Sequence, residues 1–355
     1  MIAQYSDIII IGAGLTGLTL AYLLKQTKHT VTILEGRHRV GGRIHTLYPA
    51  GEPPQDMGAT WLGMKHLDLV DLIQELNLDI FPQEMGDKAI YEPMSINPPQ
   101  LVQLPANHDP SYRIKGGSSH IIKSLASKLT YAQILTNQVV KCIKLTGDRV
   151  EVESARAKFS AARIVSTLPP YLLFDSIQME PSLPKEISDI GRQTHTWMGA
   201  SIKVSLVYDR PFWQAEGTSG TIFSNVGPIT EMYDHSDIDN KRYALKGFMN
   251  SHYYSLNEKA RRQLILQQLI KYYGEKAATP LAYHEIVWSQ EVMTYREYKS
   301  HVLPHQNNGH AAYRYSYWDG KLILAGTETS ARHPGYMDGA VGSAKYIFNQ
   351  LKEFK

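Results

Sequence analysis

The first forty residues contain two short apolar runs separated by a longer apolar segment. Residues 8–11 are four isoleucines, a β-branched run typical of strands that are buried on both faces of a parallel sheet. The segment that follows predicts a helix over residues 15–28, and residues 31–34 (Val-Thr-Ile-Leu) predict a second strand. This order indicates a strand–helix–strand unit with two neighbouring parallel strands.

The turn between the first strand and the helix is rich in glycine. Its sequence GAGLTG, residues 12–17, has the G-x-G-x-x-G spacing: the first glycine permits the tight turn, the second lets the backbone approach a pyrophosphate, and the third lets the helix pack closely on the strand. Glu35 follows the second strand, 23 residues after Gly12, where its carboxylate can accept hydrogen bonds from a ribose. An acid at this place favours NAD or FAD over a cofactor with a 2′-phosphate.

A second glycine pair distinguishes between these two cofactors. Gly41 and Gly42 precede Arg43, and together they offer backbone N–H groups and a fixed positive charge to a diphosphate. The string EGRHRVGGR, residues 35–43, resembles the FAD-containing oxidoreductases with a glutathione-reductase-type nucleotide domain, and this resemblance implies FAD. The alternative is a basic turn whose arginines are solvated.

The C-terminal segment repeats the arrangement of the first one. Residues 322–325 predict a short strand, residues 326–328 a turn, and a helix is expected to begin near Gly335. The N–H groups and the dipole at the start of that helix can receive an anionic oxygen. We expect a second cofactor contact here.

Lys203 interrupts an apolar strand pattern over residues 201–207 (Ser-Ile-Lys-Val-Ser-Leu-Val). An unpaired ammonium buried in such a strand costs several kcal/mol. Lys203 therefore lies either on the solvent face of the strand or in a site that uses its charge.

Composition narrows the class of protein. A chain of 355 residues suggests two domains, and 43% apolar with 20% charged residues is typical of a globular protein of enzyme size. The net charge of +3 is too small for the basic face that nucleic acid requires, so no nucleic-acid partner is expected.

Single residue types exclude further classes. Cys142 is the only cysteine, which excludes an internal disulfide and a zinc site with several thiolates, and the loosely spaced histidines predict no metal site. Residues 1–7 carry no Lys or Arg, and the apolar run 8–24 contains three glycines, so we expect neither a targeting segment nor a membrane partner. The cytoplasm is the expected compartment.

Several further segments match one known family in sequence order. They are DMGATWLG (56–63), KGGSSHII (115–122), ILTNQVVKCIKL (134–145), RIVSTLPP (163–170), MGASIKVSLVYDRPFW (198–213) and LILAGTETSARHPGYMDGAVGSAKYIFNQL (322–351). With GAGLTG and EGRHRVGGR, they make the chain resemble the flavin-containing amine oxidase family, the monoamine and polyamine oxidases, along nearly its whole length.

This resemblance implies a fold. It is an α/β fold in which an FAD-binding, Rossmann-like domain of the glutathione-reductase type is interleaved with a reduced substrate domain on a mixed sheet. We expect residues 1–82, 111–170 and 320–355 to form the FAD-binding domain, and residues 83–110 and 171–319 to form the substrate domain. The proline-rich segment 83–113 is too short for the helical layer of larger relatives, so the site is expected to be more open or to be closed by a second subunit in a homo-oligomer.

The resemblance also assigns the cofactor contacts. Residues 58–61 would pass along the flavin ring, Val139 would meet the adenine, and Glu328 with residues 335–337 would hold the ribityl and pyrimidine end. The predicted FAD-binding residues are Gly12, Ala13, Gly14, Leu15, Thr16, Gly17, Glu35, Gly36, Arg37, Gly42, Arg43, Gly58, Ala59, Thr60, Trp61, Val139, Gly326, Glu328, Gly335, Tyr336 and Met337.

Four residues would carry the chemistry by the same resemblance. Lys203 would hold a water against the flavin and favour its reaction with oxygen, and Trp288 would lie beside the flavin. Tyr298 and Tyr336 would be two parallel rings that orient the amine. Glu297 falls where some members have the cysteine that bonds to flavin, so noncovalent FAD is expected.

The expected activity is the oxidation of an amine C–N bond to an imine, with FAD reoxidised by molecular oxygen to give hydrogen peroxide. Two alternatives stay open. One is an FAD-dependent desaturase or dehydrogenase that acts on C–C bonds, and the other is a flavin-binding accessory protein without turnover.

Overall fold

The isoleucine run forms the centre of a nine-stranded sheet. In this computed structural model, which describes residues 4–214 and 218–352, the order of its strands is β10-β2-β1-β13-β12-β11-β14, with β21 beside β13 and β20 beside β21. Its strands are β1 (Gln4–Ile11), β2 (Val31–Leu34), β10 (Gln133–Leu135), β11 (Val140–Thr146), β12 (Arg149–Ser154), β13 (Lys158–Ser166), β14 (Gln178–Glu180), β20 (Ser316–Tyr317) and β21 (Leu322–Leu324).

The inner strands of this sheet are parallel. β1 pairs in parallel with β2 and β13, β2 pairs with β10, and the end of β13 pairs with β21. The carboxyl ends of these five strands therefore meet at one edge, which is where open α/β sheets bind their ligands.

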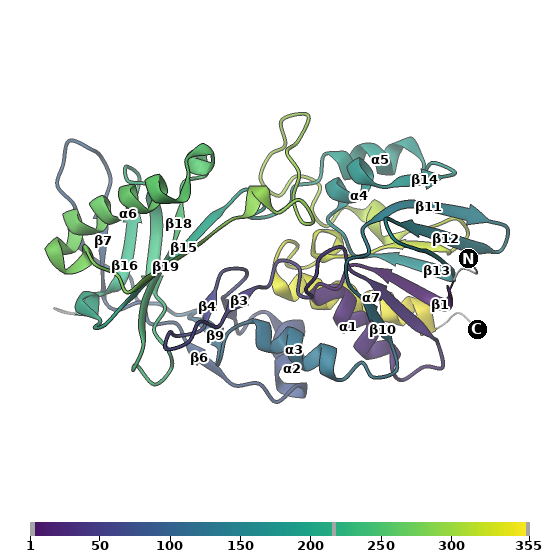
Figure 1. Ribbon diagram of the computed structural model, residues 1–355, viewed down its shortest axis with the longest axis horizontal. Helices are drawn as coiled ribbons and strands as arrows, with labels where there is room; N and C mark the ends of the chain where they lie inside the picture. Colours follow the sequence, from purple (N-terminus) through teal and green to yellow (C-terminus); the bar gives the residue numbers. More distant parts are fainter. Residues whose placement is uncertain (1–3, 215–217, 353–355) are drawn as a thin grey trace.

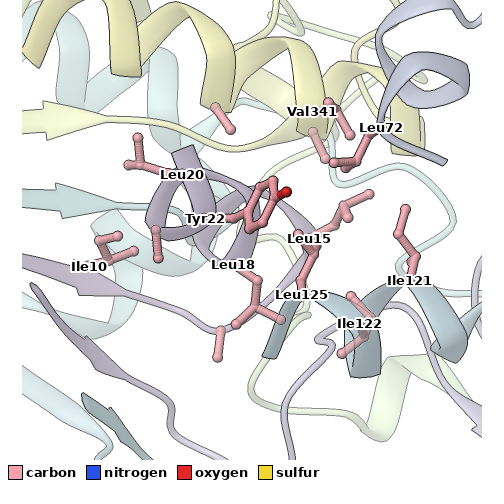
Figure 2. Packing of buried hydrophobic residues seen from close by; sticks show 14 of the residues in the cluster. Ile10, Leu15, Leu18, Leu20, Tyr22, Leu72, Ile121, Ile122, Leu125 and Val341 are labelled. Carbon is pink, nitrogen blue, oxygen red and sulfur yellow. The ribbon is translucent and has the colours of Figure 1, made fainter. Parts of the chain in front are cut away.

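Helices cover one face of the parallel strands. α1 (Leu15–Leu24), α3 (Ser119–Ser127) and α7 (Met337–Lys352) pack together there, and α2 (Leu67–Glu75) lies against α7. Figure 2 shows Leu15, Leu18 and Tyr22 of α1 among residues of the other helices, all of them in one buried apolar cluster. The shorter helices α4 (Pro170–Ser176) and α5 (Lys185–Arg192) contact each other and contribute to the cluster on the other side of the sheet.

The first helix is shorter than the predicted range 15–28. It ends at Leu24, because both the backbone N–H and the hydroxyl of Thr27 donate to the carbonyl oxygen of Leu24, at 2.9 and 2.7 Å. A threonine that satisfies this carbonyl in a turn removes the need for another helical turn.

A seven-stranded mixed sheet forms the opposite end of the molecule (Figure 1). Its order is β19-β15-β18-β17-β16-β7-β8, and its strands are β7 (Lys88–Glu92), β8 (Gln100–Gln103), β15 (Ile202–Tyr208), β16 (Thr218–Ser224), β17 (Ile229–Asp234), β18 (Tyr243–Met249) and β19 (Ala282–Val287). α6 (Glu258–Tyr273) packs on one face through Ile265 and Leu269. The other face is free to line a site.

Two small sheets lie between the large ones. β3 (Thr46–Leu47) pairs with β4 (Gln55–Asp56), and β9 (Ser111–Ile114) pairs with both β5 (Leu62–Gly63) and β6 (Ile80–Pro82). The proline-rich segment contributes the hairpin of β7 and β8 to the seven-stranded sheet, and no helix within residues 83–113.

The interleaving of the chain between the two sheets follows the predicted fold class. Residues 83–110 and most of the strands from residues 171–319 form the seven-stranded sheet, whereas β14 and β20 from the latter range pair within the nine-stranded sheet. The exact domain boundaries stay a prediction.

Candidate active site

A cavity of about 850 Å³ begins at the carboxyl edge of the parallel strands and continues to the free face of the seven-stranded sheet. Of the residues predicted to bind FAD or to act in catalysis, those that line it are Gly12, Gly14, Leu15, Thr16, Glu35, Gly36, Arg37, Gly42, Arg43, Gly58, Ala59, Thr60, Trp61, Val139, Lys203, Trp288, Gly335, Tyr336 and Met337. One continuous space thus joins the nucleotide loop to the predicted catalytic residues.

The glycine loop is shaped to admit a ligand at Gly14. A Cβ atom built on Gly14 has no heavy atom within 4 Å, so the cavity is open above this residue. A Cβ atom on Gly17, in contrast, would lie 2.0 Å from the carbonyl oxygen of Gly12. Gly14 therefore leaves room for a ligand, and Gly17 permits the close packing of helix on turn.

Glu35 is held in place by the backbone around it. Its carboxylate is buried, and its two oxygens accept hydrogen bonds from the N–H groups of Ala13 and Arg37, both at 2.9 Å. A carboxylate oxygen has more than one lone pair, so Glu35 can still accept from ribose hydroxyls. Ala13 contributes through this bond and does not line the cavity.

Arg43 and Glu328 connect the two ends of the chain. The guanidinium of Arg43 donates two hydrogen bonds to the Glu328 carboxylate, at 2.6 and 2.9 Å, and Glu328 is fully buried. Arg43 lines the cavity and Glu328 does not. In this structure Glu328 therefore holds the Arg43 side chain in place. Gly326 also lies outside the lining, and its N–H group donates to Ser343 Oγ at 3.1 Å.

Lys203 points away from α6 and into the cavity. Its neighbours Ile202 and Val204 belong to the apolar core beneath α6, so the two-residue period of β15 places Lys203 on the free face. Its Nζ atom donates to the carbonyl oxygen of Gly58 at 2.5 Å and to Thr60 Oγ1 at 2.6 Å. Lys203 is 3% exposed, so of the two sequence alternatives the solvent-facing strand position is wrong.

The surroundings of Lys203 act on its pKa in opposite directions. Burial lowers the pKa of Lys203 to about 7, while the carboxylates of Asp56 and Glu231 act in the opposite direction. The rings of Trp61 and Phe248 lie against the ammonium, with centroids 4.7 and 5.2 Å from Nζ. These contacts favour the charged form at close range.

Trp288 and Tyr336 lie at the cavity as predicted. The indole N–H of Trp288 donates to the carbonyl oxygen of Met57 at 2.9 Å, which fixes the ring against residues 57–61. Tyr336 is 42% exposed, which puts its ring at the opening of the cavity.

Tyr298 is not brought to the cavity, which corrects the expected tyrosine pair. Its hydroxyl accepts a hydrogen bond from the N–H group of Thr196 at 2.7 Å, and its ring packs edge-on against Tyr171 with 4.5 Å between centroids. Residues 291–310 form turns without a regular element, so the local sequence does not fix the direction of the Tyr298 side chain.

Trp197, Glu231, Tyr233 and Phe248 are among the lining residues that were not predicted from the sequence. Trp197 lies beside Tyr336, and Glu231, Tyr233 and Phe248 face the cavity from β17 and β18. The Tyr233 hydroxyl donates to the Glu231 carboxylate at 2.8 Å. The alternation of apolar and polar residues in β17 could have indicated that Glu231 and Tyr233 face the cavity. Met232, which lies between them, belongs to the opposite, apolar face of the sheet.

Within residues 4–214 and 218–352, no three His, Cys, Asp or Glu side chains gather in a way that could hold a metal ion. No helix in the same ranges has the length and apolar character needed to cross a bilayer.

A dinucleotide-type sheet edge, an open glycine loop and a buried lysine in one cavity define a flavin-dependent oxidoreductase. The model of the flavin containing amine oxidoreductase family matches residues 15–105 and 91–346 of this chain. The chain belongs to that family, and it is an FAD-dependent enzyme that oxidises amines.

The matches to individual relatives cover most of the chain. It is 24% identical to the probable flavin-containing monoamine oxidase A of Dictyostelium discoideum, a match that covers 98% of this chain and 97% of that protein. It is also 24% identical to the putrescine oxidase of Kocuria rosea, over 81% of this chain and 83% of the relative.

Solved structures share the fold. A putrescine oxidase with bound putrescine superimposes with a TM-score of 0.85 at 20% identity, covering 99% of this chain and all of the other. The cyclohexylamine oxidase of Brevibacterium oxydans gives a TM-score of 0.83 at 20% identity, covering 98% and 99%. The expected fold class is confirmed.

Proposed function

We propose that this enzyme oxidises the C–N bond of a small-molecule amine to an imine, and that molecular oxygen takes up the electrons to give hydrogen peroxide. The observation that carries the proposal is the single cavity with the glycine loop and Glu35 at one end and Lys203 and Trp288 at the other. FAD supplies the redox chemistry when bound, since it takes two electrons and a hydrogen from the carbon next to the amine nitrogen.

The nine-stranded sheet would bind FAD. The backbone of Gly12 and Gly14 would approach the diphosphate, Arg43 would offer it a positive charge, and Glu35 would accept from the ribose. The open space above Gly14 supports this assignment, because any side chain there would occupy it. Residues 58–61, Val139 and residues 335–337 would contact the rest of the cofactor, as their place on the cavity lining supports.

The seven-stranded sheet would present the substrate side of the site. Lys203 would put a positive charge next to residues 58–60, where it would favour electron transfer to oxygen. Tyr336 lies at the opening of the cavity, and Trp288 is hydrogen-bonded to the carbonyl oxygen of Met57. These two rings would limit how an amine enters the cavity and how it is oriented there.

We also propose that FAD is held without a covalent bond. Glu297 offers no thiol, and Cys142 lies in β11 outside the cavity lining. After acid precipitation of the yellow protein, all flavin should be recovered in the supernatant. Flavin that stays in the pellet would mean that another side chain forms a bond to it.

The reaction is tested with the purified holoenzyme and a panel of amines under nitrogen. Bleaching of the flavin absorbance near 450 nm by at least one amine, followed by recovery and peroxide formation on admission of oxygen, is the expected result. A flavin that no amine bleaches would contradict the proposal and favour an accessory protein or C–C chemistry.

A second candidate differs only in the electron acceptor. The chain is 22% identical, over 97% of its length, to a Synechocystis protein named L-amino acid dehydrogenase. Bleaching by an amine with slow recovery in oxygen but fast recovery with an artificial quinone would favour such a dehydrogenase.

Two further properties belong to the same proposal. The single cysteine is typical of a reducing compartment, which supports the cytoplasm. The exposed ring of Tyr336 at the opening of the cavity leaves room for a second subunit to cover it, so a homo-oligomer stays a prediction that sedimentation can test.

A further inference from the structure

Tyr298, the predicted partner of Tyr336, does not line the cavity, but another aromatic residue near Tyr336 does. Trp197, in the connection between α5 and β15, lines the cavity together with Tyr336. The two ring centroids are 6.3 Å apart, and the ring planes meet at 34°. Both rings therefore border the same opening from different segments of the chain.

The backbone next to Tyr336 is fitted to this tryptophan. A Cβ atom on Gly335 would lie 2.8 Å from the Cβ atom of Trp197, closer than real Cβ atoms come to such neighbours. Gly335 also has a φ of +89°, which favours glycine. A glycine at this position lets Trp197 pack directly beside Tyr336.

The ring of Trp197 is supported from outside the cavity wall. His305 stacks on it with 4.1 Å between centroids and 24° between planes. The backbone N–H group of His305 in turn donates to His195 Nδ1 at 3.2 Å, so the stacking ring is tied to the same segment that carries Trp197. This packing restricts the directions that the indole can take.

Tyr298 acts on the same segment through one hydrogen bond. Its hydroxyl accepts from the N–H group of Thr196, the residue before Trp197, at 2.7 Å. The Tyr298 ring is itself held between Tyr171 and Tyr295, with centroids 4.5 and 5.9 Å away. A half-buried phenol anchored in this way fixes the backbone at residue 196.

We propose that Trp197, beside Tyr336, forms a second part of the aromatic wall that borders the substrate opening, and that Tyr298 is a positioning residue that holds Trp197 through the backbone of Thr196. The inference rests on the proposed amine oxidation. The indole offers an amine substrate a larger electron-rich surface than a phenol does, so it serves the same orienting purpose from a different place in the sequence.

The first test compares variants at Trp197 with the holoenzyme and one amine that it oxidises. Trp197→Ala should lower the rate constant of flavin reduction about 100-fold, the size of a misorientation effect, and Trp197→Phe should lower it much less because a ring remains. Trp197→Leu keeps apolar bulk without a ring and should resemble the alanine variant. It also keeps the test decisive if the alanine variant folds poorly. The FAD spectrum and FAD content should stay as in the parent enzyme.

The second test separates a wall from a support. Tyr298→Phe keeps the ring and removes the acceptor for Thr196, so it should lower the reduction rate by about 10-fold or less in the parent enzyme. In the Trp197→Ala background the same change should have no further effect, because there is no wall left to position. A matched control is Tyr295→Phe, which leaves the bond to Thr196 in place and should leave the rate as it is.

The outcomes distinguish this inference from the proposed function. If the parent enzyme is reduced by amines while Trp197→Ala and Trp197→Leu react as fast as the parent, the inference is overturned and the function stands. If Tyr298→Phe lowers the rate by the same factor in both backgrounds, Tyr298 acts independently of Trp197 and the positioning role is wrong. If no amine reduces the parent enzyme, the proposed function itself fails.

Discussion

The Nζ atom of Lys203 lies 2.5 Å from the carbonyl oxygen of Gly58 and donates a hydrogen bond to it. Lys203 belongs to the central part of the seven-stranded sheet, and Gly58 belongs to the segment that runs from the nine-stranded sheet along the cavity. This bond, with the one to Thr60 Oγ1, places the charge of a residue in one sheet beside a segment that extends from the other sheet. In a dry environment this charge acts more strongly than it would in water.

The charge of Lys203 is expected to control the reaction with oxygen. In Lys203→Met the length and the apolar stem remain, so flavin reduction by an amine should change little, whereas reoxidation by oxygen should slow by more than about 10-fold. Stopped-flow absorbance measures both half-reactions separately. Equal rates in the variant and the parent for both would remove Lys203 from the oxidative chemistry.

The pH dependence of reoxidation should follow the same group. Burial lowers the pKa of Lys203 to about 7, so the ammonium is lost as the pH rises through 7. The reoxidation rate should therefore fall between about pH 6 and pH 8, and Lys203→Met should show no such step. Glu231 favours the charged form, so Glu231→Gln should move the step to lower pH. A step that stays in the Lys203→Met variant would belong to another group.

Lys203 should also make folding stability depend on pH. Between pH 7 and about pH 10 the unfolded chain binds a proton at this lysine that the folded protein lacks, so the free energy of unfolding should rise with pH, by up to about 1.4 kcal/mol per pH unit. Urea unfolding at several pH values measures this slope. It should be reduced in Lys203→Met and retained in Lys28→Met, whose lysine is exposed.

Two glycines of the same loop should respond differently to a methyl group. In Gly14→Ala the new Cβ meets no protein atom, so the FAD-free protein should unfold within about 1 kcal/mol of the parent while FAD affinity falls by at least about 10-fold. In Gly17→Ala the Cβ meets the carbonyl of Gly12, and the free energy of unfolding should drop by about 1–3 kcal/mol. Chemical unfolding without FAD and fluorescence titration with FAD measure both effects. Equal stability losses in the two variants would contradict the assignment of Gly14 to the ligand.

Glu35→Ala should weaken FAD binding. The carboxylate is buried at the carboxyl end of β2 and is the acceptor proposed for the ribose, and a hydrogen bond to a charged group contributes about 1.5–3 kcal/mol. Equilibrium titration of the FAD-free protein should therefore give a dissociation constant raised by about 10- to 100-fold. Since the Ala13 and Arg37 N–H groups also lose their acceptor, Glu35→Gln serves as the control that keeps one acceptor oxygen.

Local sequence determined the nucleotide end of this protein. The isoleucine run, the glycine spacing and Glu35 lie within 30 residues of one another, and each follows from backbone conformation or from the alternation of buried positions, which neighbouring residues decide. The structure confirms, for the same reason, the strands predicted at residues 31–34, near residue 322 and around Lys203. The first helix ended early because one threonine side chain satisfied its last carbonyl, a detail that periodicity does not contain.

Only the tertiary structure decided what surrounds the substrate. Lys203 is buried because the segment of residues 58–61 packs over the face of β15 opposite α6, and that is settled by contacts between residues 145 positions apart. Tyr298 leaves the cavity because a backbone N–H group at Thr196, 102 positions away, holds its hydroxyl, and the indole of Trp197 lies beside Tyr336 instead. Side chains on segments without regular structure take their direction from such distant contacts, so no local pattern in the sequence could predict them.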